Sequence, residues 1–283
     1  MPVTIIADST CDLSRAQQAD YRIRILPLTV LFGQEAYIDG VTISLPEFYQ
    51  KLQATEELPH TSQITPAEFE SAFTEALERG DEVVCITLSS SLSGTYQSAV
   101  LAREMTVSPE KIHVVDSYAV TFVTGLLVVQ AARLRDEGLS AAQIALQLEE
   151  LKKRAHLSAA IDTLKYLRMG GRLSSAGATL GGVLHLKPLV RIGEDGMVAV
   201  SSICRGTKKA YRAIAAEIKK RGIADLPGSL ALGHTDAPEL IGELSAVLTA
   251  EGIDVSHALI SDIGTVVGTH AGPGCVGVGW IAP

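Results

Sequence analysis

The stretch EVVCITLSSSLSGT, residues 82–95, joins an apolar run to a serine-rich loop that ends at Gly94. The run 82–88 has the length and β-branched content of a buried strand, and a helix is predicted from Thr95 to about residue 104. A strand, a loop and a helix in this order form the repeating unit of a parallel α/β sheet. Because ligands bind such sheets beyond the carboxyl ends of the strands, this loop is a candidate site.

Similar units flank this stretch in the first half of the chain. Continuous apolar runs predict three further strands, at residues 3–7, 26–32 and 112–115. Helices are expected at residues 66–79, 118–136 and 140–155, the first of them opened by a capping box at Thr65 and Glu68. Strands without polar alternation are typical of a parallel sheet covered on both faces. We therefore expect residues 1–155 to form a three-layer α/β/α domain.

The second half has a different pattern. The turn Gly193-Glu194-Asp195-Gly196 separates two runs and predicts an antiparallel hairpin of 187–192 with 197–204. Other expected strands lie at 157–161, 229–233, 256–260 and 275–281, and expected helices at 163–169 and 207–221. An antiparallel pair within an α/β region indicates a mixed sheet. We expect residues 156–283 to form a second α/β domain, with a ligand between the two domains.

Composition excludes several classes of function. The 283 residues carry a net charge of -8, which disfavours a nucleic-acid binder because such proteins need a basic face. The four cysteines form no CxxC pair, so neither a disulfide framework nor a metal site is expected. The apolar stretch 119–132 is shorter than the ~20 residues of a membrane span, and residues 1–7 lack the basic start of an export signal. We expect a cytoplasmic protein without stable membrane insertion.

Three segments are candidates for ligand contact. The hydroxyls of residues 89–95 and the N–H groups of the following helix favour an anion, although the serines could instead only cap the helix. The polar segment 60–63, which contains Thr61 and Ser62, precedes a helix and could face the same cleft. His270 lies in the glycine-rich segment 264–274, where the backbone can approach a ligand closely. Gly272 to Gly277 match G-x-G-x-x-G, but a strand and not a helix is expected to follow.

The ordered set of short motifs resembles one family across nearly the whole chain. The motifs are Asp8-Ser9-Thr10-Cys11-Asp12-Leu13, Thr61-Ser62-Gln63 with Thr65-Pro66, Ser91-Leu92-Ser93-Gly94-Thr95, Asp116-Ser117, Asp162-Thr163-Leu164-Lys165-Tyr166-Leu167 with Gly170-Gly171-Arg172, and Gly268-Thr269-His270 with Gly272-Pro273-Gly274. They resemble the DegV family of bacterial fatty-acid-binding proteins, which includes the acyl-carrying B subunits of fatty acid kinase.

This resemblance implies a long-chain fatty acid between two α/β domains, with no other cofactor. It implies that the carboxylate is held by hydroxyls, a backbone amide and an imidazole, at Thr61, Ser62, Ser93, Gly94 and His270. In kinase-linked members a separate ATP-binding subunit phosphorylates the bound carboxylate, so this chain would be a carrier and not an enzyme. The resemblance then associates Arg172 with docking of that subunit and implies that Arg205 lies near the acyl phosphate.

Two other classes of function stay open. A hydrolase could use Ser93 as nucleophile and His270 as base, although Ser93 is not in a Gly-x-Ser-x-Gly elbow and no acid is placed by sequence to orient His270. A nucleotide- or sugar-phosphate-binding protein is the other class, although no lysine follows the serine-rich loop. The fatty-acid interpretation is favoured because aliphatic residues can line a tunnel for an acyl chain. Aromatic residues are only 5% of the chain, which suits a flexible aliphatic ligand better than a flat ring.

Overall fold

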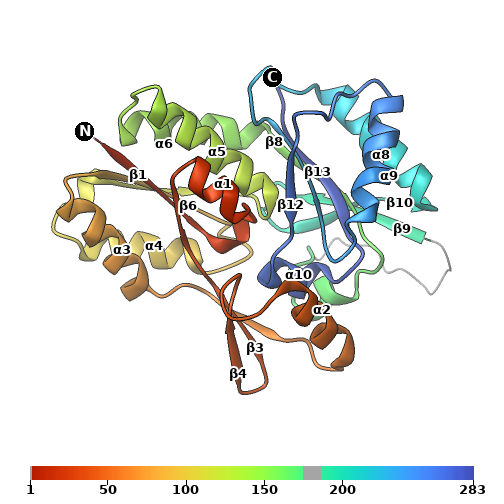
Figure 1. Cartoon of the computed structure of the whole chain (residues 1–283), viewed down its shortest axis with the longest axis horizontal. Coiled ribbons are helices and arrows are strands. Elements are labelled where there is room, and N and C mark those ends of the chain that lie inside the picture. The colour runs from red at the N-terminus through yellow and green to blue at the C-terminus, as the bar shows by residue number, and fades with distance from the viewer. Residues whose placement is uncertain (1, 175–185) are drawn as a thin grey trace.

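The computed structural model describes residues 2–174 and 186–283. Its first sheet has four strands in the order β2-β1-β6-β7, and every neighbouring pair is parallel (Figure 1). The strands are β1 (Val3–Asp8), β2 (Ile23–Leu26), β6 (Glu82–Thr87) and β7 (Ile112–Asp116). The central residues of β1 and β6 are mainly apolar and buried, as expected for a sheet covered on both faces. The predicted parallel sheet is confirmed.

Helices cover both faces of this sheet and complete the three predicted layers. One face carries α3 (Pro66–Glu78) and α4 (Thr95–Met105), and the other carries α5 (Phe122–Asp136) and α6 (Ala141–Leu151). The short helix α1 (Arg15–Asp20) packs at the edge, against β2. Helix α3 begins where the capping box predicts, because Thr65 and Glu68 each bind the other's backbone N–H. Helix α5 begins later than expected, since Tyr118 and Thr121 have φ angles of 50° and 55°.

The second sheet has six strands in the order β10-β9-β8-β13-β11-β12. The strands are β8 (Ala155–Ala160), β9 (Leu186–Ile192), β10 (Val198–Arg205), β11 (Leu230–His234), β12 (Leu259–Asp262) and β13 (Val276–Ile281). Only β11 and β12 pair in parallel among the described strands of this sheet, so it is mixed, as predicted, and it contains the expected hairpin β9–β10. Helices α8 (Thr207–Arg221) and α9 (Glu239–Ala250) pack on one face. The proposed domain boundary near residue 155 stays a prediction.

Helix α5 packs against both sheets. It contacts β1 and β6 of the first sheet and β8, β11 and β13 of the second. All residues from Phe122 to Ala132 are buried, which explains why the helix is apolar on every side. Gly233 and Gly279 make room for it, because a Cβ atom at either position would lie within 3 Å of the Phe122 ring. The apolar stretch is therefore a core helix, and no helix in residues 2–174 and 186–283 is long and apolar enough to cross a membrane.

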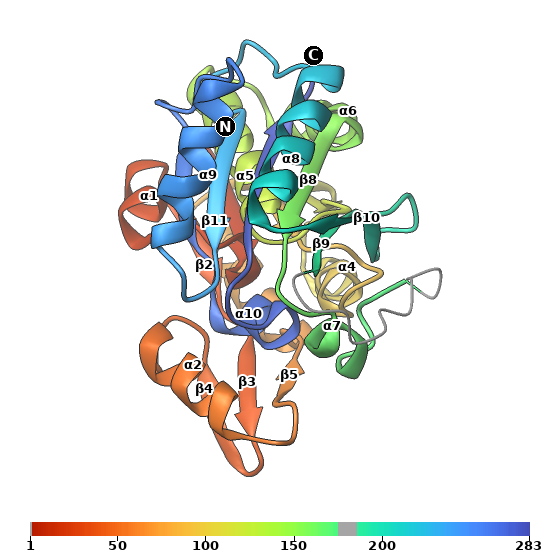
Figure 2. The ribbon, with the colours of Figure 1, turned by 90° about the vertical axis from the view of Figure 1, so that its right-hand side faces the viewer.

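A small third sheet corrects one prediction. The run 26–32, expected to be one strand, is split at Pro27, which has no N–H to donate to a sheet. Strand β2 ends before this proline, and β3 (Thr29–Phe32) pairs antiparallel with β4 (Glu35–Ile38) and β5 (His60–Ser62) (Figure 2). Helix α2 (Leu45–Ala54) packs near this small sheet. Neither α2 nor α9 was predicted from the sequence.

The glycine-rich segment 264–274 contains a helix where only close-approaching backbone was expected. Helix α10 (Thr265–Ala271) lies between the six-stranded sheet and the small sheet, and contacts α2 and α7 (Lys165–Met169) (Figure 2). Gly264 precedes this helix and Gly272, with a φ of 74°, ends it. The described residues also contain short 3-10 helices at Ser9–Cys11, Pro109–Lys111 and Lys152–Arg154. The last of these ends the predicted helix 140–155 early.

Candidate functional site

A cavity lies between the two larger sheets and beside α10. The empty space in the cavity is about 1000 Å³, a volume that includes solvent at its open mouth. Its walls come from both halves of the chain and are mainly aliphatic, formed by Leu28, Leu88, Leu92, Val120, Phe122, Leu157, Ala159, Ile161, Leu167, Val190, Val198, Ile263, Val266, Val267, Ala271 and Cys275. An apolar slot of this kind suits a flexible hydrocarbon chain.

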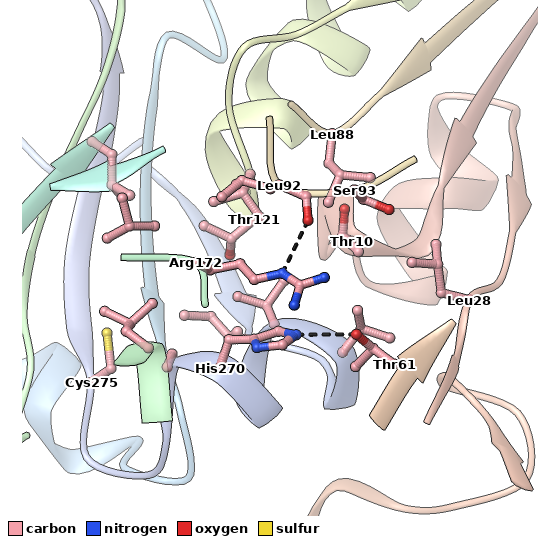
Figure 3. A pocket seen from close by; sticks show the side chains of 18 of the residues that line it. Thr10, Leu28, Thr61, Leu88, Leu92, Ser93, Thr121, Arg172, His270 and Cys275 are labelled. Carbon is pink, nitrogen blue, oxygen red and sulfur yellow. Dashed lines mark hydrogen bonds between the residues drawn. The ribbon is translucent and has the colours of Figure 1, made fainter. Parts of the chain in front are cut away.

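Polar side chains gather at one part of the cavity (Figure 3). The residues predicted from sequence to hold a carboxylate are Thr61, Ser62, Ser93, the backbone of Gly94, and His270, and all five line the cavity. They come from three places in the fold: β5, the loop between β6 and α4, and α10. The structure therefore brings together the three segments that the sequence marked as candidates. The loop before α4 lies at the carboxyl end of β6, as the rule for parallel sheets predicts.

His270 is hydrogen-bonded to Thr61 and is neutral at physiological pH. Its Nε2 atom lies 3.1 Å from Thr61 Oγ1. Burial, and to a smaller extent the charge of Arg172, lower the pKa of His270 to about 4. The Nδ1 atom is buried without a hydrogen-bond partner in the part of the chain that the structure describes. It packs on Gly170, where a Cβ atom would come within 2.2 Å of it.

Two buried aspartates from the first half of the chain hold the start of α10. Asp12 Oδ1 accepts a hydrogen bond from Gly264 N at 2.9 Å. Asp39 Oδ1 accepts from Thr265 N at 3.0 Å and from Thr265 Oγ1 at 2.7 Å. Carboxylates at this end of a helix satisfy N–H groups that have no partner within it. Burial raises the pKa of Asp12 well above its usual value. These bonds position the helix that carries His270.

Ser93 lines the cavity and also supports the start of α4, so its contact with a ligand stays a prediction. Its side chain lines the cavity and also accepts a hydrogen bond from Thr95 N at 3.3 Å, with Thr95 Oγ1 at 2.9 Å. Ser89 is purely structural by comparison: it does not line the cavity, and its hydroxyl donates to Gly196 O at 2.9 Å. The loop thus supports α4, receives the tip of the β9–β10 hairpin and presents Ser93 to the cavity.

Gln63 is a lining residue that was not singled out from the sequence. Its Nε2 atom donates to Ser98 Oγ at 2.8 Å, which lays the amide across the start of α4. A Cβ atom at Gly94 would come within 2.0 Å of Gln63 Oε1, so the absence of a side chain there makes this contact possible. The segment 60–63 was a candidate as a whole, but nothing in the sequence distinguished a glutamine that faces the cavity from one that faces solvent.

The two predicted arginines lie in different surroundings. Arg172 is half-buried and lines the cavity, with Nε donating to Leu92 O at 3.1 Å and Nη1 donating to Gly170 O. Arg205, at the end of β10, is exposed and does not line the cavity. A role in contacting a partner or a phosphate stays a prediction for both.

The geometry does not form a serine hydrolase triad. His270 Nδ1, the atom that an orienting acid would bind, has no carboxylate partner among the described residues, and Nε2 bonds Thr61 and not Ser93. Residues 2–174 and 186–283 contain no group of three or more His, Cys, Asp or Glu residues that could hold a metal ion. The site therefore consists of neutral hydrogen-bonding groups and one guanidinium at the polar part of an apolar slot.

Comparison with known proteins identifies the relatives of this chain. A DegV domain-containing protein from Caldanaerobacter subterraneus is 39% identical over 276 residues, which is 98% of this chain and 97% of the relative. A fatty-acid-binding DegV family protein from Thermus thermophilus has a solved structure with a TM-score of 0.91 and 31% identity, and covers 100% of both chains. The solved structure of DegV from Bacillus subtilis, a fatty acid binding protein, has a TM-score of 0.83 and 30% identity over 100% of both chains. The model of a family described as "Uncharacterised protein, DegV family" matches residues 2–283, and the chain belongs to the DegV family.

Proposed function

We propose that this protein binds a long-chain fatty acid, with the acyl chain in the apolar cavity and the carboxylate at its polar part. The observation that carries the proposal is the division of the cavity: sixteen apolar residues line it, and its polar residues are concentrated around Thr61, Ser93 and His270. The fatty acid binding described for the Thermus thermophilus and Bacillus subtilis relatives supports the same ligand class.

The acyl chain supplies the affinity. Burying about 14 methylene groups at ~0.8 kcal/mol each is worth on the order of 11 kcal/mol. Loss of translational freedom and ordering of the chain reduce this gain. The apolar walls are aliphatic except for Phe122 among the described lining residues. They therefore impose no flat shape on the ligand.

The polar residues select which end of the ligand stays at the mouth. A carboxylate that leaves water loses several kcal/mol of hydration unless hydrogen bonds replace it. The hydroxyls of Thr61, Ser62 and Ser93, the backbone at Gly94 and the imidazole of His270 can donate such bonds. Because His270 is neutral, it contributes an N–H donor and no charge.

The carrier would present its ligand to a separate ATP-dependent kinase subunit, which phosphorylates the carboxylate, and would catalyse nothing alone. The polar part of the cavity is open enough to leave Ser62 and Gln63 exposed, so the carboxylate lies near the surface. Arg205 is an exposed cation that can pair with an acidic surface of the kinase or with the acyl phosphate.

Organic extraction of protein purified from a bacterial host tests the ligand class. Mass spectrometry should find about one long-chain fatty acid per chain, and the delipidated protein should regain it and melt at a higher temperature. Ala159→Phe, which fills the apolar part of the cavity, is the matched control and should retain little lipid while circular dichroism shows an intact fold. An empty extract together with no thermal shift on adding palmitate would contradict the proposal. Labelling of Ser93 by a serine-directed probe would instead support the hydrolase.

A further inference from the structure

A second cavity lies between α1, α2 and β12, beyond the carboxyl ends of β1 and β2. Its empty space is about 1150 Å³, a volume that includes solvent at its open mouth. It shares no described lining residue with the cavity assigned to the fatty acid, so that ligand does not account for it. The carboxyl ends of parallel strands are the usual place for ligands in open α/β sheets.

Two buried carboxyl groups line this cavity and converge on one glycine. Asp12 is 7% exposed and Asp39 is 6% exposed. A Cβ atom at Gly264 would lie 2.9 Å from Asp12 Oδ1 and 3.2 Å from Asp39 Oδ1. The hydrogen bonds of both carboxyl groups to the start of α10 use Oδ1. Asp12 Oδ2 is buried and makes no hydrogen bond to a described residue, although the Thr121 hydroxyl lies near enough to stabilise its charge.

The basic side chain that lines this cavity does not neutralise the two carboxyl groups. Arg15 is the only basic residue among the described lining residues, and it is exposed and donates to a backbone carbonyl at 2.7 Å. A third carboxyl group, that of Asp262, is exposed and pairs with His234 at 2.8 Å. Burial is the main cause that raises the pKa of Asp12, and the charge of Asp39 adds to it. A cation between the two carboxyl groups would offset both effects.

Apolar side chains surround the carboxyl groups and indicate the kind of cation. Val41 is 61% exposed and Ile260 is 47% exposed, and Leu13, Ile25 and Leu45 complete the apolar walls. A metal ion needs several oxygen ligands and makes no use of such walls. An ammonium or guanidinium group on an aliphatic stem uses both, because the head binds carboxylates and the stem packs on apolar surface. We propose that this cavity binds a small organic cation of that kind.

Two probes of the same shape isolate the charge. Butylguanidinium and butylurea carry the same stem, but only butylguanidinium is a cation. Titration of the nitrogen-15-labelled protein with butylguanidinium at pH 8 should shift the amide signals of Gly40 and Gly264, which line the cavity. A ligand of this size should have a Kd on the order of 1 mM. Butylurea should bind at least about tenfold more weakly, because it cannot pair with the carboxylates.

Two variants test the same site in different ways. Asp39→Asn removes a charge but keeps an oxygen that can accept from Thr265, and it should weaken butylguanidinium at least about tenfold. Asp20→Asn, at an exposed aspartate of α1 outside the cavity, should have no effect. Val41→Arg leaves the hydrogen bonds to α10 intact, and its guanidinium should occupy the carboxyl groups and abolish binding of the probe. No shift with either probe, equal affinities for both, or an unchanged affinity in Val41→Arg would overturn the inference.

Discussion

His270 Nε2 and Thr61 Oγ1 lie 3.1 Å apart although 209 positions separate the two residues in the chain. The contact joins α10, which belongs to the second half, to β5 of the small sheet. Two of the groups assigned to the carboxylate are therefore hydrogen-bonded to each other across the mouth. A ligand oxygen that enters must share this hydrogen bond or replace it, so both residues are already oriented toward the position it would occupy.

The buried imidazole makes stability depend on pH in a defined window. The pKa of His270 is about 4 in the folded protein and 6.5 when unperturbed. As the pH falls below 6.5 the unfolded chain takes up this proton first, so the folded protein loses stability until about pH 4. Relative to His270→Gln, the wild type should lose up to about 1.4 kcal/mol for each pH unit in this window. Denaturant unfolding of both proteins from pH 8 to pH 4 measures the difference. A gap that does not vary with pH would show that His270 is not buried as a neutral group.

Ser93→Ala should weaken fatty acid binding by roughly 1–3 kcal/mol, because a carboxylate oxygen is left without its donor. Titration of the delipidated protein with palmitate checks this. Ser91→Ala is the matched control: Ser91 belongs to the same loop but is exposed and does not line the cavity. Equal affinities for the two variants would remove Ser93 from the site.

Gly268→Ala should destabilise the protein even though alanine favours helices. A Cβ atom there would lie 2.5 Å from Tyr49 Oη and 3.1 Å from the Phe48 ring, both buried on α2. Overpacking of this kind costs about 1–3 kcal/mol and would push α10, with His270, away from α2. Gly242→Ala on α9 is the control, since its Cβ would meet nothing within 4 Å, and it should stabilise by about 0.5–1 kcal/mol. The free energy of unfolding is measured for both; opposite signs are expected, and a stabilised Gly268→Ala would contradict this packing.

Arg205→Glu should reduce phosphorylation of the bound fatty acid while affinity for palmitate stays the same. The residue is exposed and outside the cavity, so a reversed charge alters contact with a partner and not the lipid site. The rate of acyl phosphate formation with a kinase subunit from the same organism should fall by at least about tenfold. Arg79→Glu carries the same charge reversal on the surface of the first half and should have no effect. Unchanged rates for Arg205→Glu would remove this residue from the interface.

Local signals in the sequence predicted individual elements better than their assembly. The capping box at Thr65 placed the start of α3, and α8 was predicted with its observed bounds, because both depend on neighbouring residues. The run 26–32 was wrong as a single strand, since apolar continuity does not reveal that the chain enters a new sheet after Pro27. The many glycines of segment 264–274 did not indicate a helix, yet Gly268 within α10 and Gly272 at its end make room for Tyr49 and Tyr166.

The candidate residues were predicted as separate segments, and the reason they meet is not local. Thr61, Ser93 and His270 share one cavity because β5, the loop between β6 and α4, and α10 all border it. Gln63 and the inward position of Arg172 could not be predicted, since side-chain direction there depends on Ser98, Leu92 and other distant groups.

Helix α5 limits which chimeras between members of this family should fold. It precedes residue 155 in the chain, yet its surface packs on both sheets through contacts with β1, β6, β11 and β13. A chimera joined near that residue would place an α5 from one parent against a sheet from the other, where Gly233 and Gly279 must accommodate the ring of Phe122. Recombination between distant relatives should therefore succeed only when the helix and both facing glycines are inherited together.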